Sequence, residues 1–223
     1  MIDRDQRQLG DVQIDQGVCH NGDASSLTRS IPALPRGETN QNPPGISLWE
    51  LILEDYRTNG SNILQQGFIV LALHRFGNWR MGIRNRFLRL PFTLIYRFLY
   101  PFTEWLCGIK LSYTVAVGRR VRIEHFGGMI LGARSIGNDV IIRQNTTLGI
   151  ARKEEDQGKP IIEDRVDIGA GACILGHVRV GHDSIIGANA VVVRDVPPWS
   201  VVVGVPGRVI RSRRPTDTDE VTR

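Results

Sequence analysis

From Val117 onward the chain repeats a hydrophobic pattern with a period of six residues. An aliphatic residue opens each repeat, a Gly often follows it, and a small or β-branched residue comes four positions later. After a one-residue slip, the period resumes at the third aliphatic position. The aliphatic positions are Val117, Ile123, Ile130, Ile136, Ile142, Leu148, Ile162, Ile168, Ile174, Val180, Ile186 and Val192, and the small ones include Val121, Val140, Thr146, Val166, Ala172, Val178, Ser184 and Ala190. This period predicts a β-helix in which three hexapeptides build one coil of about 18 residues.

The composition of the repeat disfavours other folds. Its many Gly and β-branched residues would cost an α-helix several kcal/mol in total. A β-sandwich would show strands about 8–12 residues apart with hairpin turns, whereas the interval here stays near six. The coils of a solenoid contact mainly their neighbours, so the end of the solenoid needs a cap and its sides can support oligomerisation. We therefore expect a capping element and a homo-oligomer.

Three helices are predicted before the repeat. Ser47 is a candidate N-cap residue with Glu50 as its capping-box partner, three residues later. The apolar residues that follow, which share one helical face, are Leu48, Leu51, Ile52 and Tyr56. A second helix is expected over roughly 68–81 and a third over about 83–105, interrupted or bent at its two prolines. These helices are the natural cap for the solenoid.

Four segments follow from these patterns. Residues 1–45 are rich in polar residues, Gly and Pro, and predict a disordered arm. Residues 46–107 predict the α-helical cap and oligomerisation region, and residues 108–211 predict the β-helix. Residues 212–223 predict a flexible tail.

Composition and charge limit the expected cellular compartment and the expected binding partners. The chain has 223 residues, a net charge of +5 and a pI near 9.5, which suits an anionic ligand such as a phosphorylated cofactor. No nucleic-acid-binding motif accompanies the charge, so we expect no nucleic-acid partner. The three cysteines, Cys19, Cys107 and Cys173, are widely spaced and give no disulfide framework. With no apolar run at its N-terminus, the chain is expected to be cytoplasmic.

The segment 87–107 raises the question of a membrane because it is strongly apolar. Arg89, Arg97, Glu104 and two prolines interrupt it, so it is not expected to cross a bilayer. Arginines among its apolar residues also fit a basic amphipathic helix on a membrane surface. Burial against other helices is the favoured expectation, and peripheral membrane contact is the alternative.

Two breaks in the repeat carry candidate chemistry. At the first, the register slips and His125 stands close to Gly127 and Gly128. An imidazole can accept a proton from a hydroxyl near neutral pH, and Gly allows a ligand to approach the backbone. The second break is a polar insertion over 150–160, which should leave the solenoid as a loop on a binding face. From the residues alone, a structural role for His125 stays open beside a catalytic one.

Five motifs occur in a specific order along residues 108–211, which are nearly half of the chain. They are Ile123–Gly128, Gln144–Gly149, Ile168–Gly176, Ile186–Val192 and Gly204–Arg208. With these motifs the segment resembles the hexapeptide-repeat acyltransferases, which have a left-handed parallel β-helix. Within that class it is most similar to serine acetyltransferases and to their relatives encoded with polysaccharide assembly genes.

The resemblance implies an O-acetyltransferase that uses acetyl-CoA as acyl donor and needs no metal. His125 matches the catalytic histidine of the family, which acts as general base on the acceptor hydroxyl. Coenzyme contacts of the family map onto Gly149, Ala170, Ala188 and Arg208. The resemblance also implies a homotrimer, with a hexamer as the alternative.

The chain departs from the serine enzymes at the positions expected to bind the acceptor, which are Lys110, Glu124 and Lys159. Lys110 stands where the family has an aspartate that orients the catalytic histidine, and Gly158-Lys159 replaces an Arg-His pair. No acidic residue between Tyr56 and Pro101 matches the family's carboxylate for the serine ammonium group. Since a desolvated amino acid needs paired charges, we expect a sugar or polysaccharide-precursor hydroxyl as acceptor, with serine as the alternative.

Two remote alternatives belong to other functional classes. A γ-class carbonic anhydrase shares the fold and binds zinc through three histidines, for which His125, His177 and His182 would be the candidates. The last two occupy different positions in their hexapeptides, which argues against a zinc site. A noncatalytic scaffold is the other alternative, because fold alone does not confer activity and Lys110 replaces a supporting residue.

Overall fold

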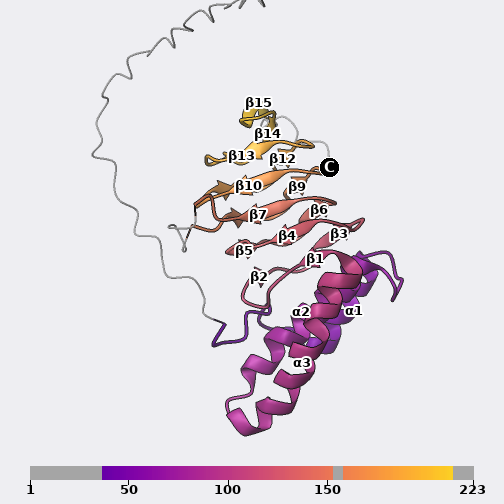
Figure 1. The fold of residues 1–223 in the computed structure, drawn as a ribbon. Coiled ribbons are helices and arrows are strands. Elements are labelled where there is room, and N and C mark those ends of the chain that lie inside the picture. Colours follow the sequence, from indigo (N-terminus) through magenta and orange to yellow (C-terminus); the bar gives the residue numbers. More distant parts are fainter. Residues whose placement is uncertain (1–36, 153–157, 213–223) are drawn as a thin grey trace, which may run out of the picture. The chain divides into compact units, whose positions relative to one another are not determined.

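The computed structural model describes residues 37–152 and 158–212, which lie in one compact unit of the chain, 31–223. Helices α1 (Leu48–Thr58), α2 (Gln66–Trp79) and α3 (Arg86–Cys107), with a short 3-10 helix η1 (Arg80–Gly82), precede fifteen strands (Figure 1). Most of the predicted arm and nearly all of the predicted tail lie outside the described residues.

The strands are two to five residues long and follow one another at nearly regular intervals. They are β1 (Ile109–Lys110), β2 (Ala116–Val117), β3 (Arg122–Glu124), β4 (Met129–Leu131), β5 (Ser135–Ile136), β6 (Ile141–Arg143), β7 (Thr147–Gly149), β8 (Ile161–Ile162), β9 (Asp167–Ile168), β10 (Cys173–Leu175), β11 (Arg179–Val180), β12 (Ile185–Ile186), β13 (Val191–Val192), β14 (Ser200–Val203) and β15 (Arg208–Ser212).

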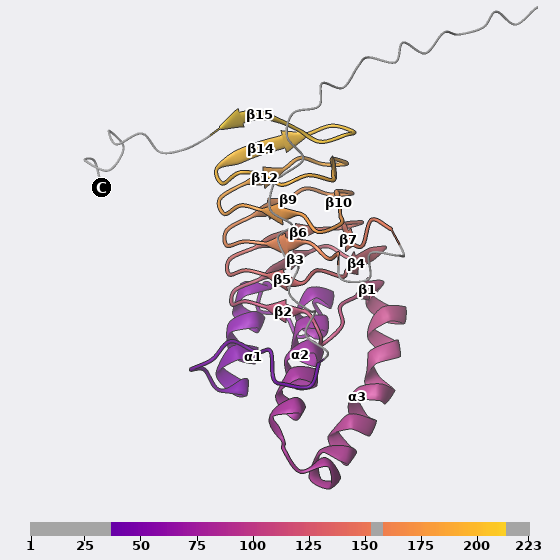
Figure 2. The same ribbon diagram turned by 90° about the vertical axis from the view of Figure 1, so that its left-hand side faces the viewer.

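Three sheets form the walls of a solenoid. Their strand orders are β1-β4-β7-β10-β13, β2-β5-β8-β11 and β3-β6-β9-β12-β14-β15, so consecutive strands pass from one wall to the next. All pairs are parallel except β14 with β15, which closes the stack (Figure 2). The predicted left-handed parallel β-helix with a helical cap is confirmed.

The core of the solenoid consists of the predicted inward positions, with one exception. Ile123, Ile142, Ile168 and their equivalents are at most 2% exposed, and the small positions are buried as well. Ile130 was predicted to point inward, but it is 48% exposed. Its neighbours Met129 and Leu131 are each 1% exposed, and Leu131 pairs in register with Leu148. The lengthened corner before β4 shifts the inward position by one further residue.

The glycines after the aliphatic positions mark where successive coils touch. A Cβ atom on Gly137 would lie 2.7 Å from the backbone nitrogen of Asp164 in the next coil. A Cβ on Gly118 would lie 2.6 Å from the carbonyl carbon of Gly137. Because a real Cβ does not approach backbone atoms so closely, any side chain at these positions would push the coils apart.

The helices begin as the sequence predicts but differ in extent. Ser47 caps α1 in a capping box with Glu50. The third helix continues through Pro91 and Pro101, so the expected interruption does not occur. Each proline lacks the N–H that would donate one helical hydrogen bond, and the helix continues without it. Part of the predicted disordered arm, residues 37–45, is held against α2, where Asn42 Nδ2 donates to the Arg75 carbonyl at 2.9 Å.

A buried ion pair joins the cap to the first coil. Arg75 of α2 and Asp55 of α1 are both fully buried, and Arg75 Nε donates to Asp55 Oδ2 at 2.9 Å. The same guanidinium donates to the carbonyl oxygens of Val117 and Gly118, at 2.6 Å each. Burial raises the pKa of the Asp55 carboxyl, and the Arg75 charge opposes that rise. All five donors of an arginine are costly to bury without partners, so this contact fixes how α1 and α2 sit on the coil.

His74, the residue before Arg75, lies at the same junction between the cap and the first coil. Its Nε2 lies 3.0 Å from the Val115 carbonyl oxygen, and the side chain is 1% exposed. Burial, together with the nearby Arg75 charge, lowers the pKa of His74 to about 3. The imidazole is therefore neutral at physiological pH and serves packing rather than proton transfer.

Candidate active site

His125 lies at the corner between β3 and β4. The corner holds four residues, 125–128, whereas the corresponding corner of the next coil, between β6 and β7, holds three, 144–146. His125, Gly127 and Gly128 adopt positive φ angles of 65°, 108° and 60°. His125 is exposed, and its imidazole makes no hydrogen bond or ion pair to any described residue. The longer corner therefore presents a free imidazole at the surface.

A polar cavity of about 230 Å³ adjoins this imidazole. It lies where the cap meets the first coil and is lined by Asn59, Gly60, Gln65, Arg122, Ile123, Glu124 and His125. The loop between α1 and α2 supplies one wall, and β3 supplies the other. The cavity is large enough for a small hydroxylated molecule to place its oxygen beside the imidazole.

Asn59 fixes this wall of the cavity. Its side-chain oxygen accepts from the Ile123 amide at 3.0 Å, and its Nδ2 donates to the carbonyl oxygens of Asp55 at 2.9 Å and Val121 at 3.1 Å. The residue is 4% exposed. One side-chain amide thus binds both the end of α1 and the backbone of β3. This contact fixes the direction in which β3 leads to His125.

The Glu124 carboxylate pairs with two arginines and makes no hydrogen bond or ion pair with His125. Arg122 Nη2 lies 3.0 Å from one carboxylate oxygen, and Arg143 Nε lies 3.1 Å from the other. Arg143 also pairs with Asp167 of the following coil. This charged row runs along three coils of one sheet. Within the described residues no carboxylate orients the His125 imidazole.

The other two expected acceptor residues lie outside the cavity lining. Lys110 is on β1, where its Nζ is 3.8 Å from Glu104 Oε1 of α3. Lys159 is half-buried just before β8, at the end of the polar insertion. The insertion leaves the solenoid between β7 and β8 as predicted, and its residues 153–157 lie outside the described part of the chain. Of the three residues, only Glu124 meets His125 in this cavity.

The expected coenzyme residues Ala170 and Ala188 share a corner column with His125. The Asn145 amide donates to the Gly127 carbonyl at 3.1 Å, linking the first coil to the second. The same corner of the third coil is joined through Gly171 N and Gln144 O at 2.9 Å, and that of the fourth through Asn189 N and Ala170 O at 2.8 Å. With coils about 4.8 Å apart, Ala188 lies roughly 14 Å along the column from the His125 corner.

Gly149 and Arg208 stand apart from this column. Gly149 ends β7 at the opposite end of that strand, and a Cβ there would meet no atom within 4 Å. Arg208 is exposed at the start of β15, and the preceding Gly207 donates from its amide to the Val191 carbonyl at 2.7 Å. The four expected coenzyme residues therefore border the sheet that contains β7, β10 and β13. Ala170 and Ala188 precede β10 and β13, Gly149 ends β7, and Arg208 lies beside the last coil.

Sequence reasoning missed several side chains of the site, namely those of Asn59, Gln65, Arg122 and Arg143. An Asn-Gly pair after a predicted helix signals a helix end, but it does not reveal a partner 64 positions away. Arg143 lies 19 positions after Glu124, which is close to one coil. The coil length could have indicated that these two opposite charges stack.

A zinc site and a membrane-spanning helix have less support in the described residues. Among them no group of three or more His, Cys, Asp and Glu side chains could hold a metal ion. His182 Nδ1 lies 2.7 Å from Asp183 Oδ2, and its ring packs edge-on against Trp199. In the described part of the chain, no helix is both long and apolar enough to span a bilayer.

Sequence comparisons link the chain to serine acetyltransferases. It is 41% identical over 146 residues to the serine acetyltransferase of Mycobacterium tuberculosis, a match that covers 64% of this chain and 60% of the relative. It is 38% identical over 133 residues to that of Bacillus subtilis, which covers 59% and 61%. The chain thus spans about three fifths of the length of the curated relatives it matches. No family model matches it.

Solved structures agree with the sequence matches. The serine acetyltransferase of Neisseria gonorrhoeae superposes with a TM-score of 0.63 at 28% identity, over 78% of this chain and 69% of that one. The soybean enzyme gives 0.62 at 29% identity, over 74% and 69%. The predicted resemblance to hexapeptide-repeat acetyltransferases of the serine type is confirmed in sequence and in fold.

Proposed function

We propose that this protein is an acetyl-CoA-dependent O-acetyltransferase with His125 as its general base. The observation that carries the proposal is the His125 corner, where an exposed imidazole without protein partners borders a polar cavity. The likeness to serine acetyltransferases supplies the reaction class. A purely structural role for His125 is disfavoured, because a side chain that holds the fold together would be buried or hydrogen-bonded.

The reaction follows from the basicity of the imidazole. His125 takes the proton of an acceptor hydroxyl while the hydroxyl oxygen attacks the thioester carbonyl of acetyl-CoA. The tetrahedral intermediate then expels the coenzyme thiolate, which receives that proton from the imidazolium. The products are an acetyl ester and free coenzyme A. Residue His125 returns to its neutral form, so no other proton donor is required.

The corner column is the proposed path of the coenzyme. Small side chains at Ala170 and Ala188 leave room for an extended pantetheine arm that leads to His125. Gly149 and Arg208 are proposed as further contacts, with the guanidinium of Arg208 suited to a phosphate. The homotrimer expected from the resemblance stays a prediction, and light scattering of the purified protein would test it.

Serine is the first acceptor to consider. The comparisons favour it over the sugar hydroxyl expected from the sequence, because the curated relatives are named serine acetyltransferases. A solved soybean relative is described as complexed with serine. None of these comparisons supports a role in polysaccharide biosynthesis.

A sugar hydroxyl remains the second candidate because of the charges in the cavity. Glu124 is the acidic residue of its lining, and two arginines already hold that carboxylate. An amino-acid ammonium group would have to compete with them for it. Asn59 and Gln65 offer neutral amides, which suit hydroxyl groups without a net charge.

Thiol release from acetyl-CoA distinguishes the candidates. The purified chain is assayed with serine, with a panel of nucleotide sugars and oligosaccharides, and without acceptor. We expect acceptor-dependent release with serine. Release only with a sugar would move the proposal to the second candidate. Release with neither, despite bound acetyl-CoA, would favour the noncatalytic scaffold and contradict the proposed function.

A further inference from the structure

Helix α3 turns an apolar face toward solvent. Trp105 is 88% exposed and Leu106 is 76% exposed, which is unusual for residues of this size. The full exposed set on this helix is Phe87, Leu88, Leu90, Leu94, Ile95, Phe98, Leu99, Phe102, Trp105 and Leu106. At 100° per residue these positions occupy one continuous side of the helix. The opposite side, with Tyr96, Thr103 and Cys107, is the one that packs inward.

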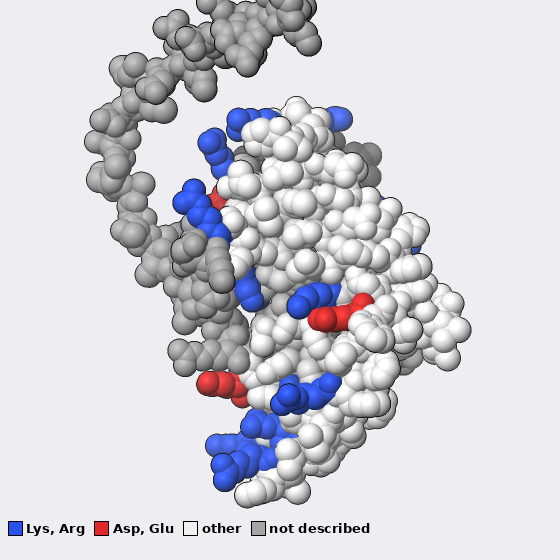
Figure 3. Space-filling view, in the orientation of Figure 1, with Lys and Arg blue, Asp and Glu red and all other residues white. Residues whose placement is uncertain are grey.

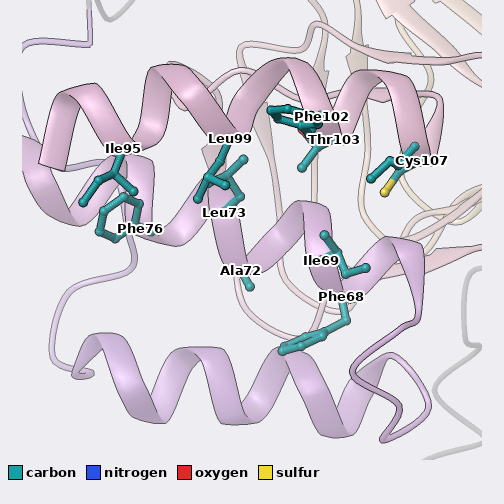
Figure 4. Close-up of a pocket in the computed structure, with 11 residues that line it drawn as sticks. Phe68, Ile69, Ala72, Leu73, Phe76, Ile95, Leu99, Phe102, Thr103 and Cys107 are labelled. Atoms are coloured by element: carbon teal, nitrogen blue, oxygen red, sulfur yellow. The ribbon is translucent and has the colours of Figure 1, made fainter.

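Within this single chain the segment is buried against other helices on one side only. Only one side of α3 faces α2, and between the two helices lies an apolar cavity of about 580 Å³ (Figure 4). Phe76, Leu73 and Ile69 line it from α2, and Ile95 and Leu99 line it from α3. Ile95, Leu99, Phe102 and Leu106 belong both to the cavity wall and to the exposed face. The cavity and the face form one apolar surface.

The charges beside this surface are mostly positive. Arg84, Arg86 and Arg97 are exposed, and no Asp or Glu occurs from residue 56 to residue 103. Figure 3 shows Lys and Arg side chains gathered at the end of the cap farthest from β15. The acidic residue of α3 is Glu104 near its C-terminal end, and it faces Lys110. Cations flanking an exposed apolar face are complementary to anionic lipid headgroups above acyl chains.

We propose that α3 docks this protein on an anionic lipid bilayer. The helix lies in the plane of the membrane surface, with its apolar face among the upper acyl segments and its arginines at the headgroups. A second copy of the chain fits less well as the occupant. Arg97 lies at mid-length of α3, beside the apolar face, so an antiparallel twofold pairing of two such faces would place the two Arg97 side chains on the same flank. Like charges brought together in this way oppose association.

Docking would bring the membrane close to the His125 corner. Trp105 lies three residues before Gly108, whose carbonyl accepts from the Met129 amide at 2.9 Å. Met129 directly follows the corner 125–128, where Phe126 is 57% exposed. The same edge of the molecule therefore carries the end of the apolar face and the candidate active site.

Vesicle binding of the full chain tests this proposal. Flotation is measured with vesicles of phosphatidylcholine alone and with vesicles that contain about one third phosphatidylglycerol. We expect binding to the anionic vesicles, weakened by added salt because screening reduces the headgroup attraction. The fluorescence of Trp105 should shift to shorter wavelength on binding. The shift should persist in Trp49→Phe and be lost in Trp105→Phe.

Charge variants keep the test independent of folding. Arg86→Gln/Arg97→Gln should weaken binding about 30-fold, since each arginine near the surface contributes about fivefold. The matched control, Arg194→Gln/Arg211→Gln, removes two exposed arginines of the solenoid and should bind as the original protein does. Phe98→Ser/Trp105→Ser should abolish binding, while Val205→Ser/Ile210→Ser should not. Thermal unfolding of each variant checks that it is folded.

Several outcomes would overturn the proposal. One is equal binding to neutral and anionic vesicles, or equal loss in the two arginine pairs. Another is an absence of vesicle binding together with an oligomer that Phe98→Ser/Trp105→Ser dissociates, which would assign the face to a second copy. A third is binding that appears only after removal of residues 1–36, which would show that the chain covers its own face.

Discussion

The first coil and the later coils of the solenoid follow different rules. In the later coils paired residues such as Ile168 and Ile186, or Ile174 and Val192, are 18 positions apart. In the first coil Ile123 pairs with Ile142, 19 positions away, because the corner that carries His125 is longer. The later coils supply a uniform wall, and the first coil supplies the cavity and the free imidazole. The proposed chemistry therefore lies where the repeat is broken.

The two regions also differ in how charges hold them together. The first coil is tied to the cap by the fully buried pair Asp55–Arg75. The corners of the later coils carry exposed pairs such as Arg165–Asp183, in which the arginine side chain is 52% exposed. Breaking a buried ion pair is strongly destabilising, whereas an exposed ion pair contributes little to the free energy of unfolding.

Removing Arg75 should give the largest loss of stability. Arg75→Ala leaves the Asp55 carboxylate buried without its partner, and should lower the free energy of unfolding by about 3–5 kcal/mol. The matched change Arg165→Ala should cost about 0–1 kcal/mol. Denaturant unfolding measures both. If the two costs were equal, the distinction between the junction and the corners would be wrong. The double variant Asp55→Leu/Arg75→Met should recover most of the loss.

The altered register of the first coil predicts the next largest effect. Leu131→Ala removes buried methyl groups and should cost about 2–5 kcal/mol. Ile130→Ala, at the neighbouring exposed position, should stay within about 0.5 kcal/mol of the original protein. Unfolding midpoints of the two variants provide the comparison. The reverse ranking would restore the inward position expected from the simple six-residue period.

Removing the Asn59 side-chain amide should destabilise the protein less than the two changes above, and it should also lower the activity. Asn59→Ala leaves the Ile123 amide and the Val121 carbonyl without this partner, which should cost about 1–3 kcal/mol. Because Asn59 sets the position of β3, kcat for thiol release should fall while coenzyme affinity stays constant. Asn138→Ala, at a corner amide that also binds backbone, is the control and should leave kcat unchanged. An unchanged kcat in Asn59→Ala would contradict the positioning role.

The smallest predicted effect is a dependence of stability on pH. The pKa of His74 is about 3 in the folded protein and near 6.5 in the unfolded chain. The unfolded chain therefore binds the proton first, and the free energy of unfolding should fall as pH drops below 6.5. The expected slope approaches about 1.4 kcal/mol per pH unit between pH 6 and 5, above the range in which carboxylates titrate. His74→Gln should flatten this slope, and an unchanged slope would contradict the assignment.

Most of the fold was readable from the sequence because a solenoid is built from local repetition. Each hexapeptide contacts its equivalent one coil away, so the positions of Ile142, Ile168 and Ile186 predict the core directly. The capping box at Ser47 is local as well. The position of Ile130 was mispredicted because the length of the His125 corner is a local exception to the period.

The site was only partly readable because its contacts are long-range. His125 and Glu124 stand out in the sequence, but Asn59 reaches the Ile123 amide beside them from a separate helical region. The arginines that hold Glu124 become partners only when the coils stack. The exposure of Trp105 likewise depends on which side of α3 packs against α2, and an amphipathic pattern alone does not say whether its apolar side is covered.

The catalytic assignment of His125 is tested most directly by kcat/KM for thiol release in His125→Asn. Asn adopts positive φ angles readily, so the corner should keep its backbone. His177→Asn, at another exposed histidine, is the matched control. The account predicts a loss of about 10²–10⁴-fold for His125→Asn, with unchanged acetyl-CoA affinity and an unchanged control. Acetyl transfer at the original rate in His125→Asn would contradict it.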